Sequence, residues 1–160
     1  MRKLNRLEIL ASLAATALTG VGLYIAFSSD PKPLSLLADD AAVVSRGQVV
    51  YAKECASCHG ENLEGQPNWQ EQMENGKLPA PPHDETGHTW HHDDQTLIDL
   101  TKRGPAAIVG NDYKTDMPGF GDRLSDHEIV AALSFIKSRW PEEIRKRQDM
   151  RNANSQAARE

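Results

Sequence analysis

An apolar run without charged side chains extends from Ile9 to Phe27, behind a basic N-terminal segment. As a helix, its 19 residues span roughly 28 Å, which is close to the hydrocarbon thickness of a bilayer. We therefore predict that residues 1–28 form a single-pass membrane anchor, which contacts the lipid bilayer through residues 9–27. The basic end of such an anchor lies on the cytoplasmic side, so the rest of the chain is exported.

A cleaved signal peptide is the competing interpretation of this segment, because it also combines a basic start with an apolar core. The run is longer than the apolar region of about 7–15 residues in such peptides. The small-residue sequence Ala26-Phe27-Ser28 is also a poor cleavage site. We favour the uncleaved anchor, and the remaining chain is exported under either interpretation.

Residues 29–39 contain two prolines and no helical pattern, and they predict an extended, semi-rigid linker. Three segments with helical patterns follow. The first extends from about Asp40 into Cys55, and apolar or small residues recur on one of its faces, at Val43, Gly47, Val50 and Tyr51.

The second predicted helix extends from about Asp94 to Arg103. An aspartate at its start acts as the N-cap, and Gly104 follows its end as a stop signal. The third helix is the best marked, because it begins at the capping box Ser125-Asp126-His127-Glu128 and ends at Trp140, ahead of a proline. The pattern after the linker is therefore that of a mainly helical domain.

The first helix leads into the sequence Cys55-Ala56-Ser57-Cys58-His59, which is the signature of covalent c-type haem attachment. Positions i, i+3 and i+4 of a helix share one face. Cys55, Cys58 and His59 can therefore meet one porphyrin together, with two thioethers to its vinyl groups and the imidazole on the iron. We predict one covalent haem c, attached through both cysteines, with His59 as a ligand of the iron.

Two other uses of a Cys-x-x-Cys pair fit this chain less well. A thioredoxin-like redox pair is expected in a βαβ context, which the helical patterns do not provide. A structural zinc site needs four ligands, and Cys55 and Cys58 are the only cysteines in the sequence. The histidine directly after the second cysteine favours haem.

A buried haem also accounts for the stretch from residue 60 to residue 93, where no clear periodic element is found. Such a long stretch of loops is unusual in an ordinary globular domain, but a large apolar cofactor gives the loops a surface to wrap. A domain of about 100 residues has only a small core of its own. We therefore predict that the domain is largely unfolded without haem.

These motifs resemble those of the class I cytochrome c family, in particular its membrane-anchored bacterial mono-haem members. The resemblance covers residues 40–140 and implies a mainly α fold, with three main helices and long loops wrapped around a covalent haem, behind an N-terminal transmembrane helix. In this family a glycine and an aromatic residue ahead of the haem motif pack against the C-terminal helix. Here these positions are Gly47 and Tyr51, and the implied contacts are Leu133 or Ile136.

The family also places a methionine ligand on the other side of the iron, usually as Met-Pro followed by an aromatic residue just ahead of the C-terminal helix. The sequence Met117-Pro118-Gly119-Phe120 has this pattern and this position. A soft, neutral thioether favours ferrous iron and raises the reduction potential. The resemblance therefore implies His59 and Met117 as the two metal ligands.

Three further residues take haem-binding roles by resemblance. In the family a proline-associated carbonyl accepts a hydrogen bond from the second ring nitrogen of the histidine ligand, and Pro81 is the best match. A tryptophan ahead of the middle helix donates to a haem propionate, which points to Trp90, and Tyr113 is a weaker candidate for the same role. For Trp90 and Tyr113, simple packing is an equally good interpretation.

A histidine-rich loop departs from the family pattern, since four of the six histidines lie within residues 83–92. Imidazoles beside carboxylates suit copper or zinc, so a second metal is one interpretation of this loop. A polar covering of the haem edge is the other, and the sequence leaves both open.

Residues 40–140 contain nine basic and sixteen acidic side chains, a formal charge of −7. Nucleic acid is not expected as a partner, because it requires a basic surface. A redox partner with a basic docking patch is expected instead, although lysines gathered at the haem edge can invert the local charge.

An iron with both a histidine and a methionine ligand has no open position for a substrate, so the resemblance implies an electron-transfer protein and no enzyme. It implies a one-electron carrier that shuttles between membrane respiratory or photosynthetic complexes, on the periplasmic side of the bacterial inner membrane. Its donor is a complex such as a quinol:cytochrome c oxidoreductase, and its acceptor is a complex such as a terminal oxidase.

Two alternative functions remain at this stage. One is a sensing or copper-handling role, through an openable Met117 site or the loop from His83 to His92. The other is that of a fixed cytochrome c subunit in a larger oxidoreductase. The charged residues 141–160 are predicted to form a solvated helix that frays into disorder.

Overall fold

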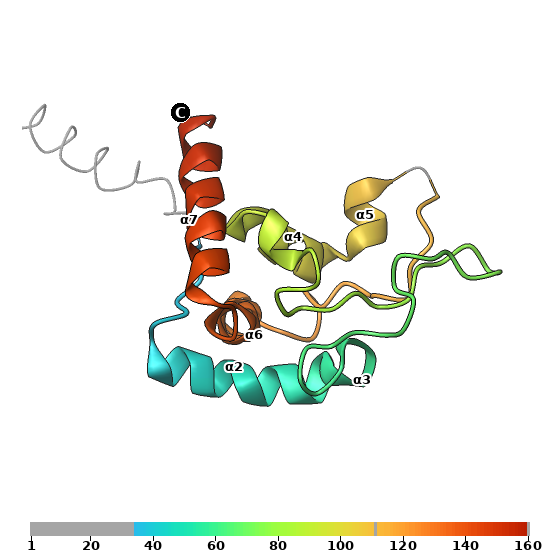
Figure 1. Cartoon of the computed structure of the whole chain (residues 1–160), viewed down its shortest axis with the longest axis horizontal. Helices are drawn as coiled ribbons and strands as arrows, with labels where there is room; N and C mark the ends of the chain where they lie inside the picture. The colour runs from blue at the N-terminus through green and yellow to red at the C-terminus, as the bar shows by residue number, and fades with distance from the viewer. Residues whose placement is uncertain (1–33, 111, 160) are drawn as a thin grey trace, which may run out of the picture. The chain divides into compact units, whose positions relative to one another are not determined.

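The computed structural model describes residues 34–110 and 112–159, which contain six α-helices, one 3-10 helix and no strand (Figure 1). The mainly α fold expected from the sequence is therefore observed in this part of the chain. The predicted membrane anchor at residues 1–28 lies outside it. None of the helices in the described residues is long and apolar enough to cross a membrane.

Helix α2 (Ala41–Glu54) begins at Asp40, whose carboxylate accepts hydrogen bonds from the first free N–H groups of the helix. It leads directly into α3 (Ala56–His59), a single turn that ends at Gly60. The predicted helix from about residue 40 into Cys55 is therefore present. Its last turn is a separate element, because the backbone at Cys55 departs from helical dihedral angles (φ −120°, ψ −37°).

Helix α4 (Asp94–Arg103) has the bounds that the sequence predicts, with Asp93 as its N-cap and Gly104 at its C-terminal end. The 3-10 helix η1 (Thr89–His91) precedes it, and the short helix α5 (Pro105–Val109) follows. Neither short element is predicted by the sequence pattern. Helix α5 starts with a proline at its first position, where the missing N–H costs nothing.

Helix α6 (Asp126–Ser138) begins with the predicted capping box, in which both hydrogen bonds between Ser125 and Glu128 are formed. It crosses α2 at Gly47, where an added Cβ atom would lie 1.9 Å from the carbonyl oxygen of Ala131 and 2.9 Å from Cβ of Phe135. The aromatic ring of Tyr51 also packs on Phe135, with ring centroids 5.4 Å apart.

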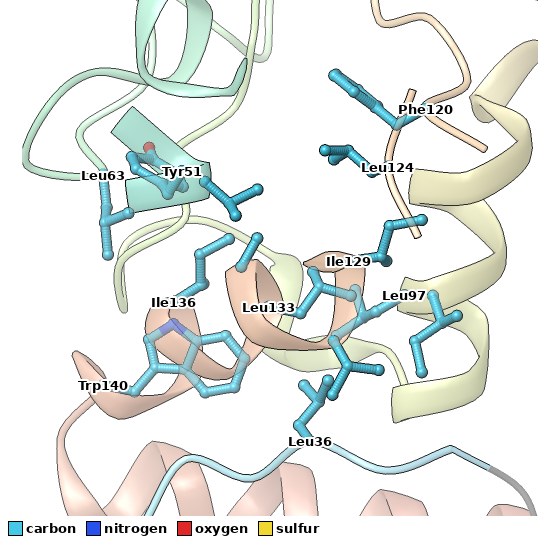
Figure 2. Packing of buried hydrophobic residues seen from close by; sticks show 14 residues of the cluster. Leu36, Tyr51, Leu63, Leu97, Phe120, Leu124, Ile129, Leu133, Ile136 and Trp140 are labelled. Carbon is cyan, nitrogen blue, oxygen red and sulfur yellow. The ribbon is translucent and has the colours of Figure 1, made fainter. Parts of the chain in front are cut away.

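The expected contact between α2 and the C-terminal helix is therefore present. The nearest atoms to Gly47 belong to Ala131 and Phe135, where the resemblance implied Leu133 or Ile136. Leu133 and Ile136 belong to the same buried cluster as Tyr51 (Figure 2). The crossing is set by backbone contact, which the apolar pattern of α6 does not reveal.

A single cluster of buried apolar side chains joins α2, α4 and α6 with the loops between them (Figure 2). It includes residues from the loops after α3 and α5 as well as from the helices. Its members are Leu36, Val50, Tyr51, Leu63, Leu97, Ile98, Phe120, Leu124, Ile129, Val130, Ala132, Leu133, Ile136 and Trp140.

Helix α7 (Glu142–Ala157) occupies the segment where the sequence suggested a solvated, fraying tail. Its Gln148 side chain is fully buried, and the amide donates hydrogen bonds to Asp94 (2.6 Å) and to the backbone carbonyl of His92 (3.3 Å). The helical start was predicted, but its length of 16 residues and its packing were not. Helix α7 is rich in charged residues, so the sequence pattern did not indicate that Gln148 forms buried polar contacts.

The last residues of the predicted linker also belong to the packed unit. Leu36 is buried, and its backbone N–H donates to Asp94 at 2.9 Å. The N–H of Leu37 donates to the hydroxyl of Ser134 at 2.9 Å. Asp94 therefore joins Leu36 to α7 through its two carboxylate oxygens. The packed unit thus extends beyond residues 40–140.

Candidate haem site

The single turn α3 brings the three residues of the attachment motif together. The backbone N–H groups of Cys58 and His59 both donate to the carbonyl of Cys55, at 3.1 and 3.0 Å. Both cysteines are free thiols, with Cys58 exposed and Cys55 partly buried against the core. His59 is buried, with 7% of its surface exposed. The spacing of the motif is thus realised as one helical turn with two available thiols.

The position of this turn is fixed by Tyr51 in the last turns of α2. The Tyr51 hydroxyl donates to the carbonyl of Gly60 at 2.8 Å, directly behind the histidine. Burial raises the pKa of this phenol well above its ordinary value, with smaller contributions from neighbouring negative groups. The hydroxyl therefore remains a donor at any physiological pH.

The ring of His59 is oriented by the carbonyl of Pro81, which lies 2.8 Å from Nδ1. A carbonyl oxygen only accepts hydrogen bonds, so Nδ1 carries the proton and Nε2 keeps a free lone pair. Burial lowers the pKa of His59, partly opposed by this hydrogen bond, so the ring is neutral at neutral pH. A neutral imidazole with a free Nε2 is the form that binds a metal ion. The hydrogen bond to Pro81 is the one that the resemblance implied.

The partial burial of Cys55 affects its reactivity. Burial raises the pKa of its thiol to about 11, and the negative charges of Glu54 and Cys58 act in the same direction. The thiolate is the reactive form of a cysteine, so very little of it is present at neutral pH in the folded chain.

His83 is a site residue that the sequence pattern did not assign to the haem. Its ring is stacked on the ring of His59, with centroids 3.9 Å apart and an interplanar angle of 21°. Burial lowers the pKa of His83 well below its ordinary value, so the stacked ring is neutral. No signal in the sequence distinguished His83 from the other histidines of its loop.

Met117 lies in the loop between α5 and α6, which is coloured orange in Figure 1. Its side chain is partly buried against the core cluster, and its N–H donates to the hydroxyl of Thr115 at 3.0 Å. The loop is pinned to the end of α4, because Phe120 donates its N–H to the carbonyl of Thr101 at 3.0 Å. At Gly119 a Cβ atom would come within 2.9 Å of backbone atoms of α4, so only glycine allows this approach.

The two propionate candidates have other contacts in the described chain. Trp90 Nε1 donates to the carbonyl of Glu85 at 3.3 Å, and its ring stacks on His91 with centroids 3.7 Å apart. Tyr113 is exposed and lines a surface pocket together with Leu78. A propionate role for either residue stays a prediction.

The histidine-rich loop divides into an inner and an outer part. His83 points inward onto His59, while His88 and His92 face each other outside, with their Nε2 atoms 2.9 Å apart. Within residues 34–110 and 112–159, no group of three or more His, Cys, Asp or Glu side chains is arranged to hold a metal ion. The loop therefore does not present a second metal centre in the part of the chain that the structure describes.

Comparison with known proteins agrees with a haem-attachment site at the motif of Cys55, Cys58 and His59. The model of the cytochrome c family matches residues 44–140, which is more than half of the chain. The chain therefore belongs to the cytochrome c family, as a class I c-type cytochrome. It follows that the cofactor is covalent haem c, and two free thiols beside a neutral, oriented imidazole fit this group.

The similar curated proteins are subunits of respiratory complexes. A cbb3-type cytochrome c oxidase subunit CcoP of Azospirillum brasilense is 32% identical over 97 residues, which cover 61% of this chain and 28% of the relative. A cytochrome bc1 complex cytochrome c subunit of Corynebacterium diphtheriae is 34% identical over 65 residues, which cover 40% of this chain and 23% of the relative. The chain spans about a quarter of the length of these relatives. No solved structure matches it.

Proposed function

We propose that this protein is a one-electron carrier in which His59 and Met117 are the axial ligands of the haem iron. The orientation of His59 carries the proposal, because its Nδ1–H is held by Pro81 and its Nε2 is left for the metal. The position of Met117 supports it, since the loop that contains this residue is held against α4 by hydrogen bonds from Phe120 and Gly121 and by the close approach at Gly119. When bound, haem c supplies a reversible ferric/ferrous couple.

The roles of the protein residues follow from their chemistry. His59 offers a neutral nitrogen from a buried position, and Met117 offers a soft sulfur that favours the ferrous state. Two protein ligands leave no position for a substrate, which suits electron transfer and not a reaction at the iron.

The partners and the location belong to the same proposal. The apolar run at residues 9–27 supports an anchor in the bacterial inner membrane, with the cytochrome domain on the periplasmic side. The similarity to subunits of an oxidase and of a bc1 complex supports a donor such as a quinol:cytochrome c oxidoreductase and an acceptor such as a terminal oxidase. Anchoring raises the effective concentration of the carrier near membrane partners.

The ligand assignment is tested with Met117→Ala, using Met73→Ala as the matched control. Met73 is also a loop methionine of the domain, and 39% of its surface is exposed. In the ferric wild type we expect the weak long-wavelength charge-transfer band of methionine-ligated haem. We expect Met117→Ala to lose this band, to have a lower reduction potential and to bind CO, whereas Met73→Ala keeps the wild-type spectrum. Persistence of the band in Met117→Ala would show that another group is the ligand.

A second candidate function is that of a fixed subunit in a larger oxidoreductase. The observation that favours it is that the similar curated proteins are themselves subunits of respiratory complexes. Mild detergent extraction of native membranes, followed by affinity purification of the tagged chain, separates the two. A mobile carrier elutes alone, and a fixed subunit elutes with stoichiometric partner subunits.

A further inference from the structure

We propose that His83 is a positioning residue for the proposed iron ligand His59: its stacked imidazole fixes the plane of the His59 ring. The inference rests on the proposed function, because it takes His59 as a ligand. It concerns His83, which belongs to the histidine-rich loop and lies outside both the attachment motif and the methionine loop.

The existing hydrogen bond leaves one motion of His59 unconstrained. The contact between Nδ1 and Pro81 at 2.8 Å holds one edge of the ring. A single hydrogen bond tolerates rotation of the ring about the line that joins donor and acceptor, because its energy depends weakly on that rotation. The face contact with His83, at a centroid separation of 3.9 Å and 21° between planes, opposes this rotation. The two contacts together define the ring plane.

His83 is itself fixed by three hydrogen bonds, as a positioning residue requires. Its Nδ1 lies 2.7 Å from the hydroxyl of Thr89, which is buried. Its backbone N–H donates to the carbonyl of Leu63 at 2.7 Å, and its carbonyl accepts from Trp140 Nε1 at 2.7 Å. The ring and the backbone of His83 are thus fixed by the loop after α3, by η1 and by the end of α6. The orientation of His59 therefore depends on the packing of the whole unit.

The orientation of the ligand ring has a direct electronic consequence. The π orbitals of an imidazole interact with the iron d orbitals in a direction set by the ring plane, so a rotation of the ring redistributes unpaired spin over the porphyrin in the ferric state. Neighbours that orient a metal ligand tune the metal in this way. The hyperfine-shifted haem-methyl resonances and the low-spin EPR spectrum report the ring plane, and a merely structural contact would not change them.

The experiment compares four variants of the haem-loaded, full-length protein. His83→Leu keeps the volume but removes the flat ring, and His83→Phe keeps a flat ring but loses the hydrogen bond to Thr89. Thr89→Val retains His83 and releases its ring from the hydroxyl. His127→Leu is the control, because it removes an exposed histidine of α6. Haem-methyl NMR shifts and EPR spectra are recorded for each ferric protein.

We expect His83→Leu to displace the haem-methyl resonances by more than their line widths and to broaden the EPR signal. Thr89→Val should cause a smaller displacement in the same direction. His83→Phe keeps the flat ring but also loses the hydrogen bond to Thr89, so its displacement should be no larger than that of Thr89→Val, and His127→Leu should match the wild type. This order identifies the flat face as the active feature. Should His83→Leu fail to fold, Thr89→Val and His83→Phe still decide the question.

The outcomes separate this inference from the proposed function. Wild-type shifts in both His83→Leu and Thr89→Val overturn the positioning role, while the methionine-ligated spectrum of the same samples leaves the proposed function intact. A displacement in His83→Phe as large as in His83→Leu also overturns it, because a flat ring then has no special effect. A wild-type spectrum that shows no histidine ligation overturns the proposed function and the positioning role with it, whereas histidine ligation without methionine overturns only the assignment of Met117.

Discussion

The close crossing of α2 and α6 predicts that Gly47→Ala destabilises the folded protein, although alanine is the better helix former. A Cβ atom at this position would lie 1.9 Å from the carbonyl oxygen of Ala131. Ordinary contact begins at about 3.4 Å, so the two atoms must separate by about 1.5 Å. The obstructing atom belongs to the backbone of α6 and cannot rotate away. The helices must therefore move apart, which also loosens the packing of Phe135.

The size of the effect follows from two opposing contributions. Overpacking of a close-packed interface costs about 1–3 kcal/mol, and a clash with backbone belongs at the upper end of this range. The gain in helix propensity from glycine to alanine is about 1 kcal/mol. The net destabilisation is therefore about 2 kcal/mol, equivalent to a decrease in Tm of roughly 8 °C for a unit of this size.

The assay is guanidinium unfolding of the haem-loaded protein, followed by far-UV circular dichroism. Gln48→Ala is the matched control, because it makes the same residue at the next, exposed position of α2 and is expected to leave the stability within about 0.5 kcal/mol of the wild type. A Gly47→Ala protein as stable as the wild type, or more stable, would show that the two helices do not approach so closely and refute the reasoning.

Three further predictions concern α7, an N-cap and the haem. Gln148→Leu should lower the free energy of unfolding, measured with urea, by about 1–3 kcal/mol, because it removes the buried donor to Asp94. An unchanged midpoint would mean that the side chain of Gln148 is not buried against Asp94. Burial raises the pKa of Asp93, but hydrogen bonds from Thr96 and Arg159 outweigh it and hold the pKa below its ordinary value. The folded pKa is thus below the unfolded one, so this stabilisation is present above about pH 4 and is lost on acidification. Asp93→Ala should therefore lose about 1 kcal/mol at neutral pH and show a weaker acid dependence than the wild type in pH-resolved melting curves. A double Cys55→Ala, Cys58→Ala variant cannot attach haem and should give no cooperative thermal transition by circular dichroism, whereas a compact, cooperative product would contradict a haem-dependent fold.

Much of the helical framework could be predicted from the sequence because its signals are local. The capping box at Ser125, the aspartate at position 93 and the glycine at position 104 each act within one helical turn, and α4 and α6 begin where these residues place them. The attachment motif is local in the same sense. Its spacing alone defines one turn with two thiols and an imidazole, so the chemistry of the cofactor follows from five consecutive residues.

The packing partners were decided by the tertiary structure, because they join residues far apart in the sequence. Gly47 contacts the backbone of Ala131, and this close approach depends on a missing side chain, which the apolar pattern of α6 does not indicate. Gln148 lies in a charged segment that suggests solvent exposure, yet Asp94 accepts its hydrogen bond in the interior.

The same distinction holds at the haem site. The sequence by itself predicted His59 as an iron ligand, because the two cysteines of the attachment motif are its near neighbours. The resemblance also implied the carbonyl of Pro81 as the partner of the ring, and the structure places it 2.8 Å from Nδ1. Only the folded chain places His83 on the face of the ring. Those contacts depend on the path of the loop between α3 and η1, which has no periodic pattern. Hydrogen bonds that join His83 to Leu63 and to Trp140, both distant in the sequence, hold this path. The spacing of the motif residues determines which groups can attach the haem, and long-range packing determines the orientation of the His59 ring.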